Sequence, residues 1–151
     1  MSITISRGVS APAQYVDQTT REVRARLIEP ATFTRQSAYD ALWDAWQPCQ
    51  IADWDDESAD PIEHETFRIA YRLIEALPIG CPLPTVSAEP DGHLSFEWYK
   101  HPRRLLSVSI SGNGTLYWAA LVGSEDSRGS CQFFDEFPST LLRWVGRVYA
   151  T

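Results

Sequence analysis

The chain has 151 residues, of which 44% are hydrophobic and 12% aromatic, and its formal net charge is −7 at pH 7. This length and composition favour one soluble domain with a substantial core and exclude a largely disordered chain. The negative charge disfavours direct binding to nucleic acid or to an anionic membrane, and no apolar stretch approaches the length of a membrane span.

The three cysteines, Cys49, Cys81 and Cys131, lie far apart and form no C-x-x-C pair. The sequence therefore predicts neither a zinc ribbon nor a redox motif. The N-terminal segment also lacks the basic region and apolar run that are typical of a signal peptide. We expect a cytoplasmic protein whose thiols are free.

The first half of the chain, residues 16–77, is predicted to be mainly helical. Residues 1–15 contain a glycine, a proline and small side chains, which are typical of a loop or an arm. Apolar residues at helical spacing predict a first helix over residues 16–29 and a second over about 34–47. Thr34 is placed to cap the start of the second helix.

A polar connector over residues 49–60 leads to a third predicted helix that ends near Leu77. Asp60 is expected to be its N-cap, with Pro61 at the first helical position and Glu63 at the third. This is a capping-box pattern with the favoured first-turn proline. Prolines and a glycine soon after Leu77 stop the helix.

Over residues 85–135 the apolar period changes from helical to alternating, which predicts antiparallel strands. Asp91-Gly92 and Asn113-Gly114 predict tight hairpin turns, because both dipeptides accept positive φ angles. A first strand is expected at about 85–89, and a last strand at Cys131 and Phe133 after a loop over residues 123–129. The side chains expected to face the core are Leu94, Phe96, Trp98, Leu106, Val108, Ile110, Leu116 and Trp118.

The chain ends in a helical pattern over residues 138–150. The order of elements predicts a single α+β domain over residues 1–151, with a four- to five-stranded antiparallel meander. The N-terminal helices and the C-terminal helix are expected to pack on one face of this sheet.

The opposite face of the predicted sheet mixes aromatic and small side chains and carries little charge, which suits a protein interface, including that of a homodimer. The competing expectation is that the first helix or the N-terminal arm covers this face. The turn between two of the strands is basic and suits an acidic partner, although such turns are commonly only solvated. The candidate partner-binding residues of this region are Glu97, Tyr99, Arg103, Arg104 and Tyr117.

Carboxylates are densest in the loop over residues 53–60. The candidate partner-binding residues there are Asp53, Trp54, Asp55, Asp56 and Glu57. Three readings are open: a solvated loop at a helix start, a partner-binding loop, and a cation site. An EF-hand is excluded, because Ser58 stands where the loop needs glycine and His64 where it needs glutamate. Trp54 is expected either to seal the core or to anchor an interface.

Common catalytic motifs fail at identifiable residues. His64-Glu65 begins an H-E-x-x-H pattern, but Arg68 occupies its last position. The chain contains neither G-x-S-x-G nor G-x-G-x-x-G. We therefore predict no catalytic residue, no metal and no cofactor, and regard an enzyme as the less favoured alternative.

A longer pattern is carried by Trp54-Asp55, then Ala59, Pro61 and Ile62, and later by Glu97-Trp98-Tyr99. It resembles a group of small uncharacterised bacterial proteins whose pattern is close to W-D-G-x-G-A-x-P-I with a later E-W-Y strand. The resemblance covers roughly residues 53–122. Asp56 and Ser58 stand where the pattern has glycines, which implies a stiffer and more acidic loop.

The group has no established activity, so the resemblance implies no catalytic residues. It implies a binding protein encoded beside mobile or toxin–antitoxin-like genes. The leading hypothesis is a protein-binding module that sequesters or inhibits a partner, in the manner of an antitoxin, immunity or anti-defence protein. The negative charge of the chain would favour a basic partner. The alternatives are a small metal-dependent or hydrolytic enzyme that uses the acidic loop with His64 or His93, and a structural subunit of a larger assembly.

Overall fold

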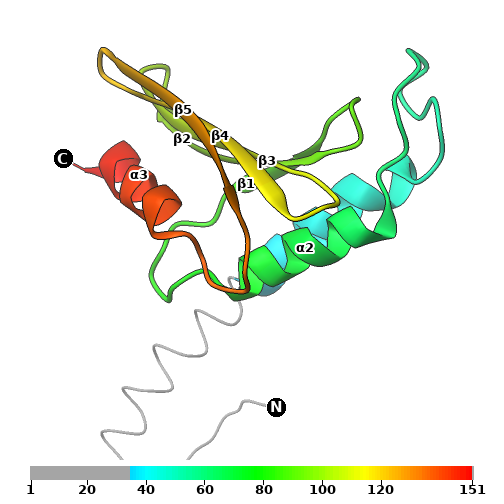
Figure 1. The fold of residues 1–151 in the computed structure, drawn as a ribbon, viewed down its shortest axis with the longest axis horizontal. Helices are drawn as coiled ribbons and strands as arrows, with labels where there is room; N and C mark the ends of the chain where they lie inside the picture. Colours follow the sequence, from blue (N-terminus) through cyan, green and yellow to red (C-terminus); the bar gives the residue numbers. More distant parts are fainter. Residues whose placement is uncertain (1–34, 151) are drawn as a thin grey trace, which may run out of the picture. The chain divides into compact units, whose positions relative to one another are not determined.

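Five strands form one antiparallel sheet in the computed structural model, which describes residues 35–150. The strands are β1 (Thr85–Ala88), β2 (Leu94–His101), β3 (Arg104–Ile110), β4 (Thr115–Val122) and β5 (Glu125–Gln132). Each strand pairs with the next in chain order, so the sheet is a meander (Figure 1). The predicted α+β fold with an antiparallel meander is confirmed.

Three helical regions accompany the sheet. Residues 35–46 are helical and continue into the 3-10 turn η1 (Gln47–Cys49), followed later by α2 (His64–Glu75) and α3 (Ser139–Tyr149). All five strands belong to the compact unit that begins at Ala38. The predicted arm at 1–15, the helix at 16–29 and the Thr34 cap lie outside the described residues.

The two predicted hairpin turns are present. Gly92 and Gly114 have φ angles of 92° and 88°, a region that glycine adopts without strain. The turn at Gly92 pairs Ala88 with Leu94, and the turn at Gly114 sets Ile110 opposite Leu116. Since side chains alternate between the two faces of a strand, these registers place the apolar residues of neighbouring strands on one side.

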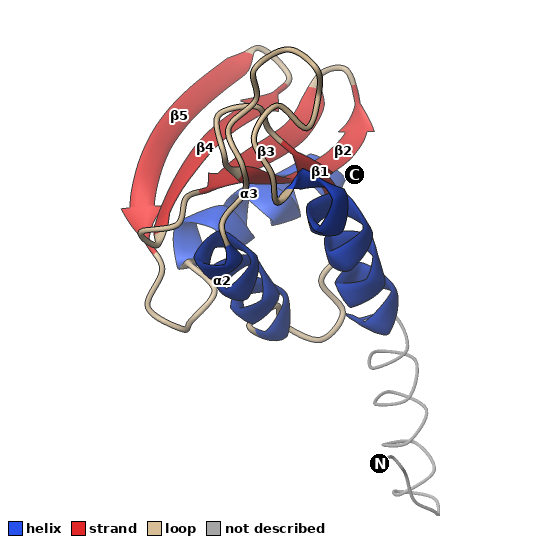
Figure 2. Ribbon diagram, turned by 90° about the vertical axis from the view of Figure 1, so that its right-hand side faces the viewer, coloured by secondary structure: helices blue, strands red, loops and turns tan. Residues whose placement is uncertain are grey.

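That side, the inner face, is the core of the unit. Both α2 and α3 contact the strands and lie on the same side of the sheet (Figure 2). Full burial of a large apolar side chain contributes roughly 1.5–3 kcal/mol, so this layer dominates the stability of the fold. All predicted core positions are buried except Trp118, which is half-buried against Trp144: Leu94, Phe96, Trp98, Leu106, Val108, Ile110 and Leu116.

Helix α2 begins at His64 and not at Pro61, so the predicted capping box is wrong. Glu63 is the N-cap residue and its side chain makes no capping hydrogen bond. The preceding segment is held extended by tertiary contacts instead. The Asp60 amide donates to the Pro90 carbonyl at 2.8 Å, and the Ile62 amide donates to the Cys49 carbonyl at 2.8 Å. These bonds satisfy the amides that a helix would leave unpaired, so the local capping signal is overridden.

Strand β5 also begins earlier than predicted, because residues 125–129 belong to the strand and not to a loop. Val122 pairs with Glu125, which leaves a two-residue turn, and the amide of Gly123 donates to the Arg103 carbonyl at 2.8 Å. The segment E-D-S-R-G-S has no apolar alternation, so its sequence carries little strand signal. Pairing with the strongly apolar β4 determines its conformation.

Candidate functional site

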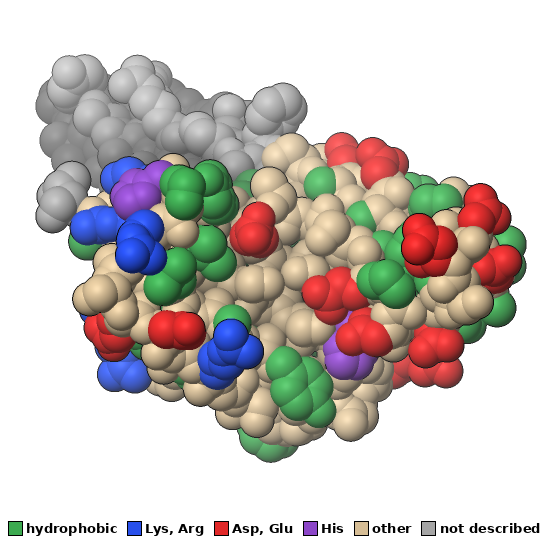
Figure 3. Space-filling view, turned by 90° about the horizontal axis from the view of Figure 1, so that it is seen from above, with side chains coloured by type: hydrophobic (Ala, Val, Ile, Leu, Met, Phe, Trp, Pro, Cys, Tyr) green, Lys and Arg blue, Asp and Glu red, His purple; other side chains and the backbone are tan. Residues whose placement is uncertain are grey.

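The face of the sheet away from the helices, here called the outer face, carries two exposed tyrosines. Tyr99 on β2 is 50% exposed and Tyr117 on β4 is 47% exposed. Figure 3 looks down on this face and shows basic side chains and a histidine gathered at one end, and most acidic side chains together with another histidine at the other. The other outer-face residues of the central strands are Ser95, Glu97, Leu105, Ser107, Ser109, Ala119 and Leu121.

Strand register arranges these side chains in rows across the sheet. One row is apolar at its centre, with Leu105 paired to Leu121 between Tyr99 and Asp126. The next row has small side chains at its centre and opposite charges at its flanks: Glu97, Ser107, Ala119 and Arg128. The outer face is therefore a mixed surface, as predicted from the alternation, and its apolar row lies near the β2–β3 turn.

A polar cluster occupies the end of the outer face at the β1–β2 turn. The ring of His93 stacks on Tyr117, with centroids 5.9 Å apart and planes 3° apart. The Ser109 hydroxyl lies 2.9 Å from His93 Nδ1 and donates to Glu89 Oε1 at 2.6 Å. Asp91 Oδ2 lies 3.6 Å from the same Nδ1. These contacts hold the imidazole at its Nδ1 edge and over one face of the ring.

This arrangement differs from a catalytic Ser-His-Asp triad. In a triad the imidazole links the serine and the carboxylate through its two different nitrogens. Here Ser109 and Asp91 both face Nδ1 of His93. The cluster therefore lacks the geometry by which a histidine takes a proton from one partner while the other stabilises its charge.

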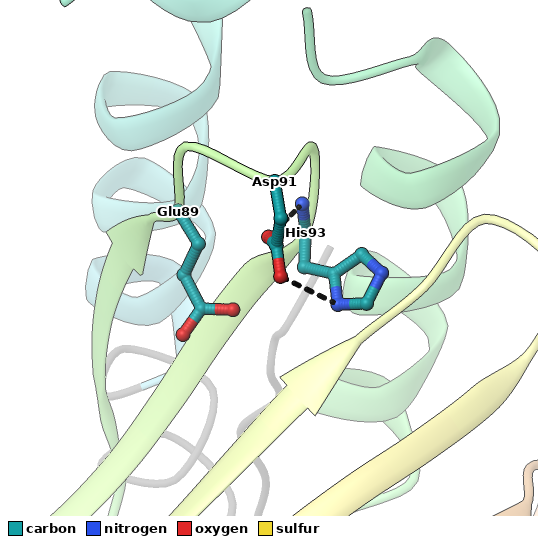
Figure 4. A group of neighbouring side chains, drawn as sticks. All are labelled: Glu89, Asp91 and His93. Carbon is teal, nitrogen blue, oxygen red and sulfur yellow. Dashed lines mark hydrogen bonds and ion pairs between the residues drawn. The ribbon is translucent and has the colours of Figure 1, made fainter. Parts of the chain in front are cut away.

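The same turn brings together three side chains of metal-ligand type. Among residues 35–150, Glu89, Asp91 and His93 are the group of three whose ligand atoms all lie within 4.8 Å of one another. Figure 4 shows Asp91 and His93 joined across the turn, with the Glu89 carboxylate beside them. Sequence reasoning treated Asp91-Gly92 only as a turn and missed Glu89 and Asp91 as a site. The spacing E-P-D-G-H was the available signal, because a tight turn brings such neighbours together.

The acidic loop is organised by its own carboxylates. Asp53 Oδ1 accepts a hydrogen bond from the Ser58 amide at 2.7 Å. Asp55 Oδ1 accepts from the amides of Glu57 at 2.8 Å and Ala59 at 3.0 Å. Two of the predicted partner-binding carboxylates therefore hold the loop in shape, and the exposed Asp56 and Glu57 remain the candidates for outside contact.

Three residues of this loop have left-handed backbone conformations. Their φ angles are 61° at Asp53, 61° at Asp56 and 72° at Ser58. Asp56 and Ser58 are the two positions where the pattern described above has glycine. Left-handed conformations cost a non-glycine residue about 1 kcal/mol or more, and aspartate tolerates them better than serine.

Trp54 packs against the edge of the core and fastens the acidic loop to it. Its Nε1 donates to the Asp60 carbonyl at 2.8 Å. This geometry agrees with the expectation that Trp54 seals the core. Asp60 in turn donates its amide to Pro90, so the acidic loop adjoins the turn that carries Asp91.

The two candidate arginines of the β2–β3 turn lie in different surroundings. Arg103 is exposed in the turn. The Arg104 guanidinium instead donates to the carbonyls of Arg147, at 3.5 Å, and Ala150, which places it against the end of α3. Cations near a helix C-terminus are stabilising, so Arg104 has a structural role that the sequence did not indicate.

The cysteines show no sign of nucleophilic activation. Burial raises the pKa of each thiol, Cys49, Cys81 and Cys131, and the charge of Asp55 raises that of Cys49 further. A nucleophilic cysteine needs a lowered pKa so that the thiolate is populated. The Cys49 thiol also donates to the Ala45 carbonyl at 3.3 Å, as a buried structural cysteine does.

Comparison of the chain with protein-family models, with curated proteins and with solved structures finds no match. Within residues 35–150, no helix is both long enough and apolar enough to span a membrane.

Proposed function

We propose that the chain is a protein-binding module that sequesters or inhibits a partner protein, as an antitoxin, immunity or anti-defence protein does. The observation that carries this proposal is the pair of exposed tyrosines on the outer face, Tyr99 and Tyr117. Tyrosine is enriched among residues that dominate binding energy, because it buries a large ring at little conformational cost and keeps a polar tip. Leu105 and Leu121 add an apolar contact in the row of Tyr99, whereas Tyr117 lies in the row of Ser109 and Ser95 at the other end of the face.

The charge of the chain indicates the chemistry of the partner. The net charge is −7, and the acidic loop adjoins the acidic end of the outer face. A basic partner surface would be attracted over a distance of about 10 Å at moderate ionic strength, which speeds encounter. We propose the cytoplasm as its setting, because all three cysteines are free.

The test begins with the tagged full chain as bait in a lysate of its native host. Proteins retained by the wild type and lost by the double variant Tyr99→Ser, Tyr117→Ser are identified, purified and titrated against the chain by calorimetry. We expect the double variant to bind at least about 30-fold more weakly, since truncating an aromatic residue that anchors an interface costs about 2 kcal/mol or more.

The matched control is Phe134→Ser, which removes an aromatic ring that is 78% exposed and lies outside the strands. It should leave the affinity unchanged, and all variants should retain the wild-type melting temperature. A partner that binds the double variant as tightly as the wild type would refute a role for the outer face. Failure of any protein to depend on these tyrosines would refute the proposed function.

The role of the acidic loop is tested separately with Asp56→Asn, Glu57→Gln. These side chains are exposed, whereas Asp53 and Asp55 are needed for the loop itself. The double variant should bind more weakly at low salt and equally at high salt, because long-range attraction is screened by ions. Affinity that is unchanged at low salt would show that the loop does not contribute.

A further inference from the structure

The β1–β2 turn assembles three potential metal ligands on a short, closed piece of backbone. The Glu89 amide donates to the His93 carbonyl at 2.9 Å, and the Gly92 amide donates to the Glu89 carbonyl at 3.1 Å. The His93 amide donates to Asp91 Oδ1 at 3.1 Å. Side chains two and four residues apart are therefore held on one side of a turn whose backbone is already ordered.

The separation of the ligand atoms approaches that of a bound metal. Asp91 Oδ2 and His93 Nδ1 are 3.6 Å apart, and all three ligand atoms lie within 4.8 Å of one another. Two ligands of a tetrahedral zinc ion at about 2.0–2.2 Å from the metal lie about 3.4 Å apart. The Asp91–His93 pair needs a shift of only a few tenths of an ångström, and Glu89 needs a rotation about its side-chain bonds.

Charge at the turn gives an independent reason to expect a cation. Glu89 and Asp91 form no ion pair with a lysine or arginine among the described residues. The acidic loop lies next to the turn, where Asp60 bonds to Pro90. Two carboxylates and a neutral imidazole form a ligand set with a charge of about −2, which a divalent cation neutralises.

The hydrogen bond to Glu89 resembles the outer shell of a metal site. Carboxylates that bind a metal are themselves held in orientation by hydrogen bonds. Here Tyr117 stacks on the His93 ring, and the Ser109 hydroxyl bridges His93 and Glu89. The Ser109 hydroxyl lies between Glu89 and His93; when a metal binds it would keep its hydrogen bond to Glu89 and give up Nδ1.

We infer that Glu89, Asp91 and His93 form a site for a divalent cation of the zinc type at the acidic end of the outer face. A mixed set of one imidazole and two carboxylates suits zinc, whereas calcium and magnesium favour oxygen ligands alone. The fourth position faces solvent, since Asp91 is exposed. This inference does not depend on the proposed partner binding, because the ligands all belong to this chain.

The experiment is a titration of the metal-free full chain with Zn²⁺, followed by calorimetry and by NMR of the backbone amides. We expect saturable binding of one ion per chain, with the largest shifts at residues 89–93. His93→Gln and Asp91→Asn should each weaken binding by about 100-fold or more. Ser109→Ala should weaken it by about tenfold, the lower end of the range for an outer-shell group.

The matched controls are His101→Gln, at the last residue of β2, and His64→Gln, at the start of α2, since both histidines are exposed. Both should bind Zn²⁺ like the wild type. Absence of saturable binding would overturn the inference, as would binding that survives His93→Gln or is lost in a control. Tighter binding of Mg²⁺ or Ca²⁺ than of Zn²⁺ would overturn the zinc-type assignment.

Discussion

Replacing Gly129 by alanine tests the packing of Trp118 on the inner face of β5. A Cβ atom at Gly129 would lie 2.7 Å from Cζ2 and 2.9 Å from Cε2 of Trp118. These distances are shorter than any ordinary contact between carbon atoms, which starts at about 3.5 Å. The indole is rigid and also packs against Trp144, with ring centroids 5.9 Å apart. The added methyl group therefore has to displace either the ring or the strand.

The magnitude follows from two opposing terms. Overpacking a well-filled core costs about 1–3 kcal/mol. Replacing a glycine lowers the entropy of the unfolded chain and thereby stabilises the folded state by about 0.4–1 kcal/mol. We expect Gly129→Ala to lower the free energy of unfolding by about 1–2 kcal/mol, which corresponds to a decrease in melting temperature of about 2–8 °C in a domain of this size.

The assay is thermal and urea unfolding followed by circular dichroism, with near-ultraviolet spectra to report on the tryptophan environment. Gly146→Ala provides the control, because Gly146 lies inside α3 and a Cβ there would meet no atom within 4 Å. That substitution should stabilise the protein by up to about 1 kcal/mol through helix propensity. A Gly129→Ala protein as stable as the wild type would refute the packing argument.

Three further predictions concern the acidic loop and the end of α3. Ser58→Gly should leave the stability unchanged or raise it by up to about 1 kcal/mol, because glycine adopts a left-handed φ without strain. Ser58→Val should lower the stability by about 2 kcal/mol, since valine tolerates a left-handed φ poorly. The midpoints of urea unfolding measure both effects. Asp55→Ala removes the acceptor for two loop amides and should destabilise the domain by about 1–2 kcal/mol. Hydrogen exchange should become faster only at the amides of the loop. An equal increase in exchange at amides throughout the domain would contradict this. The hydrogen bond to Arg147 holds the pKa of Glu125 below its ordinary value of 4.5. The stability that this pair contributes should therefore be present above that value and lost as the pH falls below it. Glu125→Gln should flatten this part of the profile of unfolding free energy against pH. A profile that the substitution leaves unchanged would exclude the bond.

The strands show how far local patterns determine structure. Alternation of apolar and polar residues from Leu94 to Val122 predicted both the strands and the side that faces the core, because the pleat has a period of two residues. The turn dipeptides at Gly92 and Gly114 predicted the connections, because positive φ angles are favourable there. The exposed Tyr99 and Tyr117 followed directly from the same alternation.

Local patterns failed where contacts distant in sequence decide the conformation. The capping signal at Asp60 was overridden by backbone bonds to Pro90 and Cys49, and β5 formed without a strand signal because it pairs with β4. In the acidic loop, the sequence identified the density of carboxylates but not that Asp53 and Asp55 bond to the loop's own amides.

The sequence by itself determined an α+β chain with a meander, its core residues and the residues of the outer face. These properties depend on residue type at regular spacing, which a single sequence contains. Only the tertiary structure decided which polar groups meet. Ser109 is 16 positions from His93, and strand register alone brings its hydroxyl within 2.9 Å of the imidazole. The proposed cation site depends on this meeting of side chains, because ligand geometry is a property of the folded backbone and not of residue spacing.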